Sequence, residues 1–199
     1  MINLLKMRIC YIISILILCF GSQGVASDIK NYEVEGMSIG DSLLKFFSEK
    51  EIKQFDNYDN FPSDMKFRIA EFNDGDPMSL DIYDAIQFFY KPNDKKYEIY
   101  NIAGARDCEQ QKCLKLKKEI EKSLRDTFTN IKPKNQKLKH PDDKSGKSTV
   151  DITFFEMKNG DISVSHYQWS ENVNHRDHVR LSVSTNEAIQ WSSNNYGAK

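Results

Sequence analysis

The 199-residue sequence has no apolar stretch long enough to cross a membrane. Its main hydrophobic run, residues 9–20, is broken only by Ser14 and falls short of the roughly 20 residues that a transmembrane helix needs. The sequence also lacks an excess of charge, since 28 basic and 29 acidic residues give a net charge of −1. Nucleic-acid binding requires a broad basic surface, so this balance argues against nucleic acid as a partner.

Cysteine is scarce too, with four residues in all. Cys10 and Cys19 lie in the N-terminal apolar run, which leaves Cys108 and Cys113 for the rest of the chain. Zinc would need four ligands and a redox motif would need C-x-x-C, so neither fits, and the sequence indicates no cofactor. Two cysteines this close in an oxidising compartment favour a structural disulfide. Residues five apart diverge on a regular helix, so we expect Cys108 in the turn before a helix.

The N-terminal residues 1–26 have the pattern of an export signal. Lys6 and Arg8 supply a positive segment, residues 9–20 an apolar one, and Gly24 and Ala26 the small residues that a signal peptidase reads. Cleavage is predicted after Ala26. Lipidation at Cys19 is disfavoured because bulky Leu18 precedes it. Residues 27–199 are then one periplasmic or secreted domain of charge −3 (26 basic minus 29 acidic residues).

The predicted fold class is α+β with antiparallel strands. Two capping boxes, at Ser38 to Asp41 and Ser48 to Glu51, predict a helix pair. Alternating apolar residues predict three strands over residues 66–72, 83–91 and 97–103. An apolar residue at every fourth position predicts a long helix over residues 108–130. Three more strands follow over residues 150–154, 162–169 and 179–183, then a short helix over residues 186–191, in one continuous or two packed sheets.

Residues 131–148 are polar and lysine-rich and contain Pro133 and Pro141. This composition predicts an exposed linker between the long helix and the last strands.

Residues 40–43 spell Gly-Asp-Ser-Leu, the motif of GDSL-type esterases, which makes Ser42 the one candidate nucleophile. A serine needs a base to take its proton, and that family supplies a histidine from a D-x-x-H element. None of the four histidines has an aspartate three residues before it. A secreted serine esterase therefore stays the alternative interpretation, and Asp41 is explained as a helix cap.

His166, His175 and His178 are candidate metal ligands, because imidazoles are suitable donors for zinc or copper. Arg176 between the last two adds an opposing charge, and a solvated loop explains these residues equally well. We expect no tight metal site. The aromatic residues Tyr167, Trp169 and Trp191 could line a groove for sugar or peptide, but packing on a sheet face is the favoured interpretation.

Two resemblances bear on function. The segment YEVEGMSIGDSLL at residues 32–44, with residues 167–170 and 177–183, resembles a group of exported bacterial proteins to which no activity is assigned. Gly36-Met37-Ser38, followed by a helix pair and three strands, resembles more weakly the SmpA/OmlA-type domain of outer-membrane assembly lipoproteins. Neither implies a catalytic residue. The sequence therefore predicts a non-catalytic binding or envelope-associated module, with another envelope protein as its expected partner.

Overall fold

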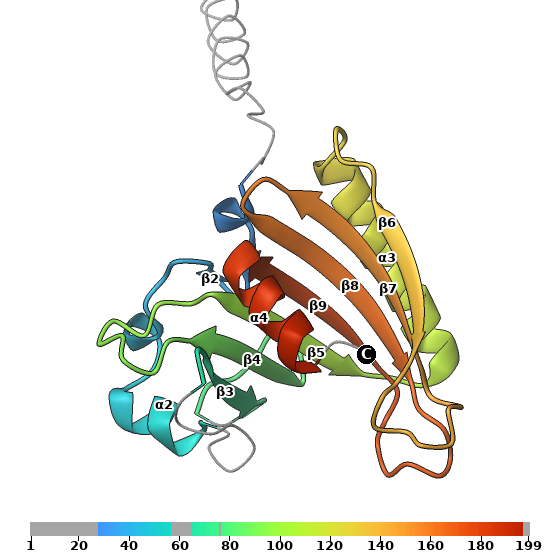
Figure 1. The fold of residues 1–199 in the computed structure, drawn as a ribbon, viewed down its shortest axis with the longest axis horizontal. Coiled ribbons are helices and arrows are strands. Elements are labelled where there is room, and N and C mark those ends of the chain that lie inside the picture. The colour runs from blue at the N-terminus through green and yellow to red at the C-terminus, as the bar shows by residue number, and fades with distance from the viewer. Residues whose placement is uncertain (1–27, 57–64, 76, 197–199) are drawn as a thin grey trace, which may run out of the picture.

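The computed structural model describes residues 28–56, 65–75 and 77–196 (Figure 1). The predicted export signal lies outside the described residues. Among those residues, no helix is both long and apolar enough to cross a membrane.

The centre of the fold is one antiparallel sheet of seven strands in the order β3-β4-β5-β9-β8-β7-β6 (Figure 1). β9 joins the two halves, because it pairs with β5 from Asn101↔Ser184 to Asp107↔His178 and with β8 on its other side. The α+β antiparallel class is thus confirmed, and the sheet is one continuous sheet. The strands are β3 (Arg68–Asn73), β4 (Ala85–Tyr90), β5 (Asn101–Asp107), β6 (Lys134–Lys139), β7 (Thr149–Met157), β8 (Gly160–Gln168) and β9 (His178–Thr185).

Two helices cover opposite faces of this sheet. The long helix α3 (Gln110–Thr127) packs behind β8 and β9, and the C-terminal helix α4 (Asn186–Tyr196) crosses in front of them (Figure 1). Of the predicted apolar stripe of α3, Leu124 and the capping residue Phe128 are fully buried, whereas Leu116 and Ile120 are only partly covered. Lys117 is also buried, at 4% exposure, where it forms ion pairs with Glu121 and Asp151.

The N-terminal part differs from its prediction. It contains η1 (Ile29–Asn31), a hairpin of β1 (Glu33–Val34) and β2 (Met37–Ser38), the 3-10 turn η2 (Leu43–Lys45) and the short helix α2 (Glu49–Gln54). The capping box at Ser48 and Glu51 is confirmed. The helix predicted from Ser38 is wrong: Ser38 ends a strand, and Ser42 caps the 3-10 turn instead. Residues 40–43 are held by backbone hydrogen bonds to residues 97 and 99, which compete with helix formation.

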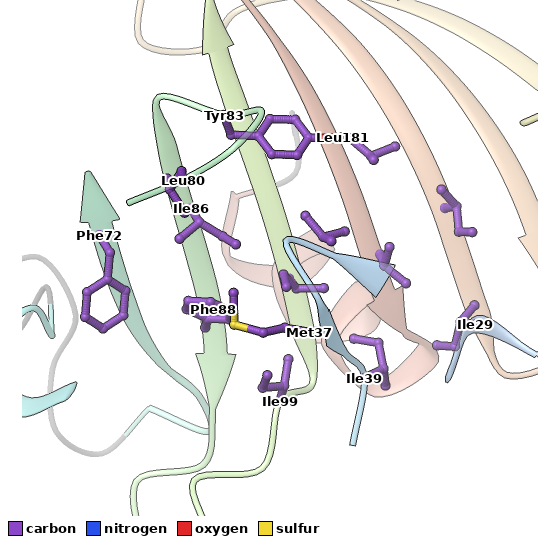
Figure 2. Close-up of a cluster of buried hydrophobic side chains, with 14 of the residues drawn as sticks. Ile29, Met37, Ile39, Phe72, Leu80, Tyr83, Ile86, Phe88, Ile99 and Leu181 are labelled. Carbon is purple, nitrogen blue, oxygen red and sulfur yellow. The ribbon is translucent and has the colours of Figure 1, made fainter. Parts of the chain in front are cut away.

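The main core lies between the sheet and the N-terminal segment, where Met37, Ile39, Phe88 and Ile99 pack together (Figure 2). A smaller cluster lies under α4. It consists of Phe67, Ile69, Phe89, Ala188 and Trp191. Both sheet faces are therefore partly apolar, one face beneath each helix.

Residues 131–148, predicted as an exposed linker, contain the edge strand β6, which pairs with β7 along its whole length. The strand is exposed at all but one position, and it carries Lys134, Lys137 and Lys139. Pairing with β7 makes this segment a strand, and its lysines fit the edge position because charged side chains there hinder pairing with another chain.

Candidate functional site

Ser42 is a structural cap rather than one half of a nucleophile–base pair. Its Oγ accepts a hydrogen bond from the backbone N–H of Leu44 at 3.2 Å and donates one to the carbonyl oxygen of Lys96. A carbonyl cannot take a proton as a base does, so these bonds orient the turn and do not activate the hydroxyl.

The disulfide Cys108–Cys113 is confirmed, with the two Cα atoms 5.4 Å apart. Cys108 follows the end of β5, and Cys113 lies in the first turn of α3. The backbone N–H of Cys108 also donates to the carbonyl oxygen of Asp177, at 3.0 Å, in the loop before β9. The bond therefore fixes the start of α3 to the strand exit, as the spacing predicted.

The three candidate metal ligands do not form one group. His166 on β8 points to the face covered by α3 and is 3% exposed, whereas His178 on β9 pairs with Tyr167 and shares the opposite face. His175 lies in the exposed loop before β9. Throughout the described ranges, no three His, Cys, Asp or Glu side chains are grouped to hold a metal ion.

A cluster of five rings lies where β8 and β9 meet their loops. The ring of His178 stacks on that of Tyr167, with centroids 4.4 Å apart, and Trp169 contacts His140 at 4.2 Å and His175 at 4.5 Å. Burial lowers the pKa of both His140 and His178, which keeps them neutral at pH 7. Because these rings cover one another, they bind the loops together. Trp191 is separate, since it packs against Phe67 and Phe89 under α4.

Asp143 connects two loops at the same end of the sheet, the loop before β7 and the loop after β8. Its carboxylate accepts hydrogen bonds from the backbone N–H groups of Ser145 and Ser148 and from the hydroxyls of Ser148 and Ser170. These bonds hold the pKa of Asp143 well below its ordinary value. Asp143 thus links the loop before β7 to the residues that follow β8.

A charged depression of about 850 Å³ opens beside the disulfide. The end of β5, the outer side of α3 and the loop before β9 line it. Its lining side chains carry both signs of charge: Arg106, Asp107, Cys108, Glu109, Lys112, Leu116, Glu119, Arg176 and Asp177.

A smaller apolar cavity of about 180 Å³ adjoins this depression. Arg106 and Leu116 line both spaces, so the depression forms the charged entrance to the cavity. The remaining lining comes from α3, β9, the N-terminal segment and the loop before β4: Tyr32, Ile82, Tyr83, Ile120, Ser123, Val179 and Leu181.

The loop that carries Ile82 is held in place by charged groups. Glu35 sits in the β1–β2 turn at a φ of 52°, a left-handed conformation that costs a non-glycine residue free energy. Its carboxylate accepts hydrogen bonds from the backbone N–H groups of residues 81, 82 and 83 at 2.9, 2.8 and 3.2 Å. Arg106 donates to the carbonyl oxygen of Ile82 at 3.1 Å. We call these hydrogen bonds of Glu35 and Arg106 the clamp on Ile82. Ile82 is nevertheless 54% exposed, so the clamp holds an apolar side chain in solvent beside the cavity.

Tyr83 forms the adjoining wall, and Gly104 makes room for it. The Tyr83 ring lies over β5 beside Leu181 (Figure 2). A Cβ added at Gly104 would lie 2.5 Å from that ring, closer than carbon atoms can approach. Only glycine at this position therefore lets the ring lie flat on the sheet. Burial raises the pKa of the Tyr83 hydroxyl, which keeps it uncharged.

Sequence reasoning missed this site. The every-fourth-residue pattern of residues 108–130 includes Leu116 and Ile120 and predicts that both are buried in the core, and nothing in the sequence marks Arg106. The one available signal was the apolar Ile82 next to Asp81, just before the predicted strand that begins at residue 83, and a single exposed apolar residue is common on protein surfaces.

The fold and the cavity define an α+β protein in which one antiparallel sheet and a covering helix enclose a small apolar pocket with a charged entrance. No protein-family model matches the chain, and neither a curated protein nor a solved structure matches it.

Proposed function

We propose that this chain is a non-catalytic binding module that works outside the cytoplasm and takes an apolar group of its ligand into the cavity beside α3. The observation that carries the proposal is the clamp on Ile82. Glu35 and Arg106 fix the backbone of a largely exposed isoleucine at the rim of a cavity of about 180 Å³. Exposing an apolar side chain forgoes the stability that its burial would give, so a ligand that covers it would recover that free energy.

The size of the cavity suits a small apolar group. Apolar cavities of about 150 Å³ in other proteins stay dry and bind benzene. A six-carbon chain that buries about five methylenes gains about 4 kcal/mol at roughly 0.8 kcal/mol each. That free energy corresponds to a Kd of about 1 mM, within reach of a titration followed by NMR.

Export is supported by the sequence of residues 1–26, and the disulfide is compatible with an oxidising compartment. Mass spectrometry of the protein recovered from the cell envelope should show an N-terminus at Ser27. A chain that retains residues 1–26 would contradict export.

The test of binding is an NMR titration of the purified protein with n-hexanol. We expect saturable shifts at amides around Ile82, Leu116 and Ile120. Ser123→Phe should abolish them, because Ser123 lines the cavity and the larger ring would fill it. Lys122→Phe is the matched control, since the neighbouring Lys122 side chain is 78% exposed and outside the cavity lining. Shifts that persist unchanged in Ser123→Phe would contradict the site.

The rival interpretation, a secreted esterase, is tested separately. Purified protein should not hydrolyse short acyl esters, because the hydroxyl of Ser42 donates to a carbonyl oxygen. Hydrolysis that disappears in Ser42→Ala would overturn the binding-module proposal.

A further inference from the structure

Of the charged side chains that line the depression, Arg106 and Asp177 have no ion-pair partner among the described residues, and the others do. Asp107 lies 3.5 Å from Arg176, Glu109 3.2 Å from Lys112, and Glu119 3.8 Å from Lys115. A side-chain oxygen of Asp177, the fourth carboxylate of the depression, accepts the backbone N–H of Trp169 at 2.8 Å. Over the described parts of the chain, no carboxylate comes within ion-pair distance of Arg106.

Arg106 is placed where a second functional group of a bound ligand would lie. Its side chain lines both the apolar cavity and the charged depression, so it stands at their junction. One guanidinium N–H group is used by the carbonyl oxygen of Ile82, which also fixes the direction of the side chain. A guanidinium has five N–H donors in a planar fork that matches carboxylate and phosphate groups, so donors remain for an anion.

We propose that the ligand is a small anionic amphiphile, with a short apolar tail in the cavity and a carboxylate or phosphate headgroup on Arg106. This inference rests on the proposed binding function and adds the chemistry of the headgroup. A cationic headgroup would lie against the guanidinium and be repelled. A neutral headgroup would leave the remaining guanidinium N–H donors without an anionic acceptor.

The test compares four probes with the same six-carbon tail and different headgroups: n-hexanoate, hexyl phosphate, n-hexanol and n-hexylammonium. Each is titrated into the purified protein at pH 7 and low salt, with shifts followed at the amides of Ile82 and Leu116. We expect hexanoate, hexyl phosphate or both to bind roughly tenfold or more tightly than n-hexanol, as a hydrogen bond to a charged group implies. n-Hexylammonium should bind more weakly than n-hexanol, and acetate, which has no tail, should not saturate.

Arg106→Gln separates recognition of the headgroup from support of the loop. It should remove the preference for the anions over n-hexanol, whatever affinity n-hexanol itself loses with the bond to Ile82, because the three bonds of Glu35 still hold the loop. Arg176→Gln is the matched control, since Arg176 lines the same depression but pairs with Asp107, and it should change the preference for the anions much less than Arg106→Gln does.

The outcomes separate the two proposals. Binding of n-hexanol without preference for an anion would overturn the headgroup assignment and leave the cavity intact. An equal loss for anions and n-hexanol in Arg106→Gln would show that Arg106 only shapes the cavity, which also overturns it. Failure of every probe with a tail would instead contradict the proposed binding function. Whichever anion binds more tightly identifies the headgroup as carboxylate or phosphate.

Discussion

Asp161 on β8 offers a direct test of what burial costs this fold. It lies on the sheet face that α4 covers, opposite Ser184 of β9, and is 8% exposed. Burial, together with the nearby charge of Glu156, its cross-strand neighbour on β7, raises the pKa of its carboxyl to about 7. The proposed change is Asp161→Asn, which keeps the shape of the side chain and removes its ionisation.

The magnitude follows from the difference between a folded pKa of about 7 and the ordinary value of 3.8. Between these two pH values the folded chain holds the proton, whereas the unfolded chain has released it. The free energy of unfolding of the wild type therefore falls as pH rises from about 4 to about 7. Each pH unit between the two pKa values lowers the free energy of unfolding by about 1.4 kcal/mol, so the two units from pH 5 to pH 7 lower it by about 3 kcal/mol.

The assay is urea unfolding of both proteins at pH 5, 6, 7 and 8. Asp161→Asn should be the more stable at high pH, and the gap between the two free energies of unfolding should widen by about 3 kcal/mol from pH 5 to pH 8. His140, His166 and His178, whose pKa values burial lowers, act in the opposite direction, since they make stability rise with pH up to about 6.5. They are present in both proteins, so they cancel in the gap.

A control at Asp142, a carboxylate that is 82% exposed, shows whether any loss of charge has this effect. Asp142→Asn should not reproduce the widening of about 3 kcal/mol, because its side chain is not buried. If Asp161→Asn also runs parallel to the wild type, Asp161 is ionised in the folded state, and the reasoning from burial is refuted.

Three further changes probe the site and its supports. Cys108→Ser combined with Cys113→Ser should fold but lose about 2 kcal/mol, measured by thermal unfolding, because so short a loop restricts the unfolded chain only modestly; a protein that cannot fold would contradict this. Gly104→Ala should displace the Tyr83 ring, costing about 1 to 3 kcal/mol of stability and weakening n-hexanol binding; wild-type affinity would show that the ring does not shape the cavity. Asp143→Ala should speed hydrogen exchange at the loop amides that Asp143 accepts from; unchanged exchange would show that the ring cluster alone protects them.

Local patterns predicted most of the elements because their signals do not depend on distant partners. The every-fourth-residue pattern through Leu124 and Phe128 marked α3, and the alternation around Ile162 and Val164 marked β8. The disulfide followed from the count and spacing of the cysteines. In each case the residues that carry the signal are the residues that form the structure.

The prediction failed where distant pairing decides the outcome. The motif from Ser38 to Asp41 satisfies half of a capping box, since the Asp41 carboxylate does accept the N–H of Ser38. The Ser38 hydroxyl instead donates to the carbonyl oxygen of Tyr32, and Gly40 takes a φ of 89° that no helix allows. The prediction for β6 failed for the same reason. Its polar, lysine-rich sequence is typical of a linker, and only the pairing with β7 makes it a strand.

The cavity was beyond sequence reasoning for a related reason, because its walls come from segments far apart in the chain. Glu35 and Ile82 are separated by 47 positions and joined by one hydrogen bond of 2.8 Å. Nothing in the local sequence of either distinguishes a surface carboxylate from a clamp, or an exposed isoleucine from a cavity wall. The spacing of Leu116 and Ile120 predicted an apolar face on α3 but could not show that the sheet leaves part of it uncovered. A functional surface built this way becomes visible only when its backbone anchors and its exposed apolar group are seen together.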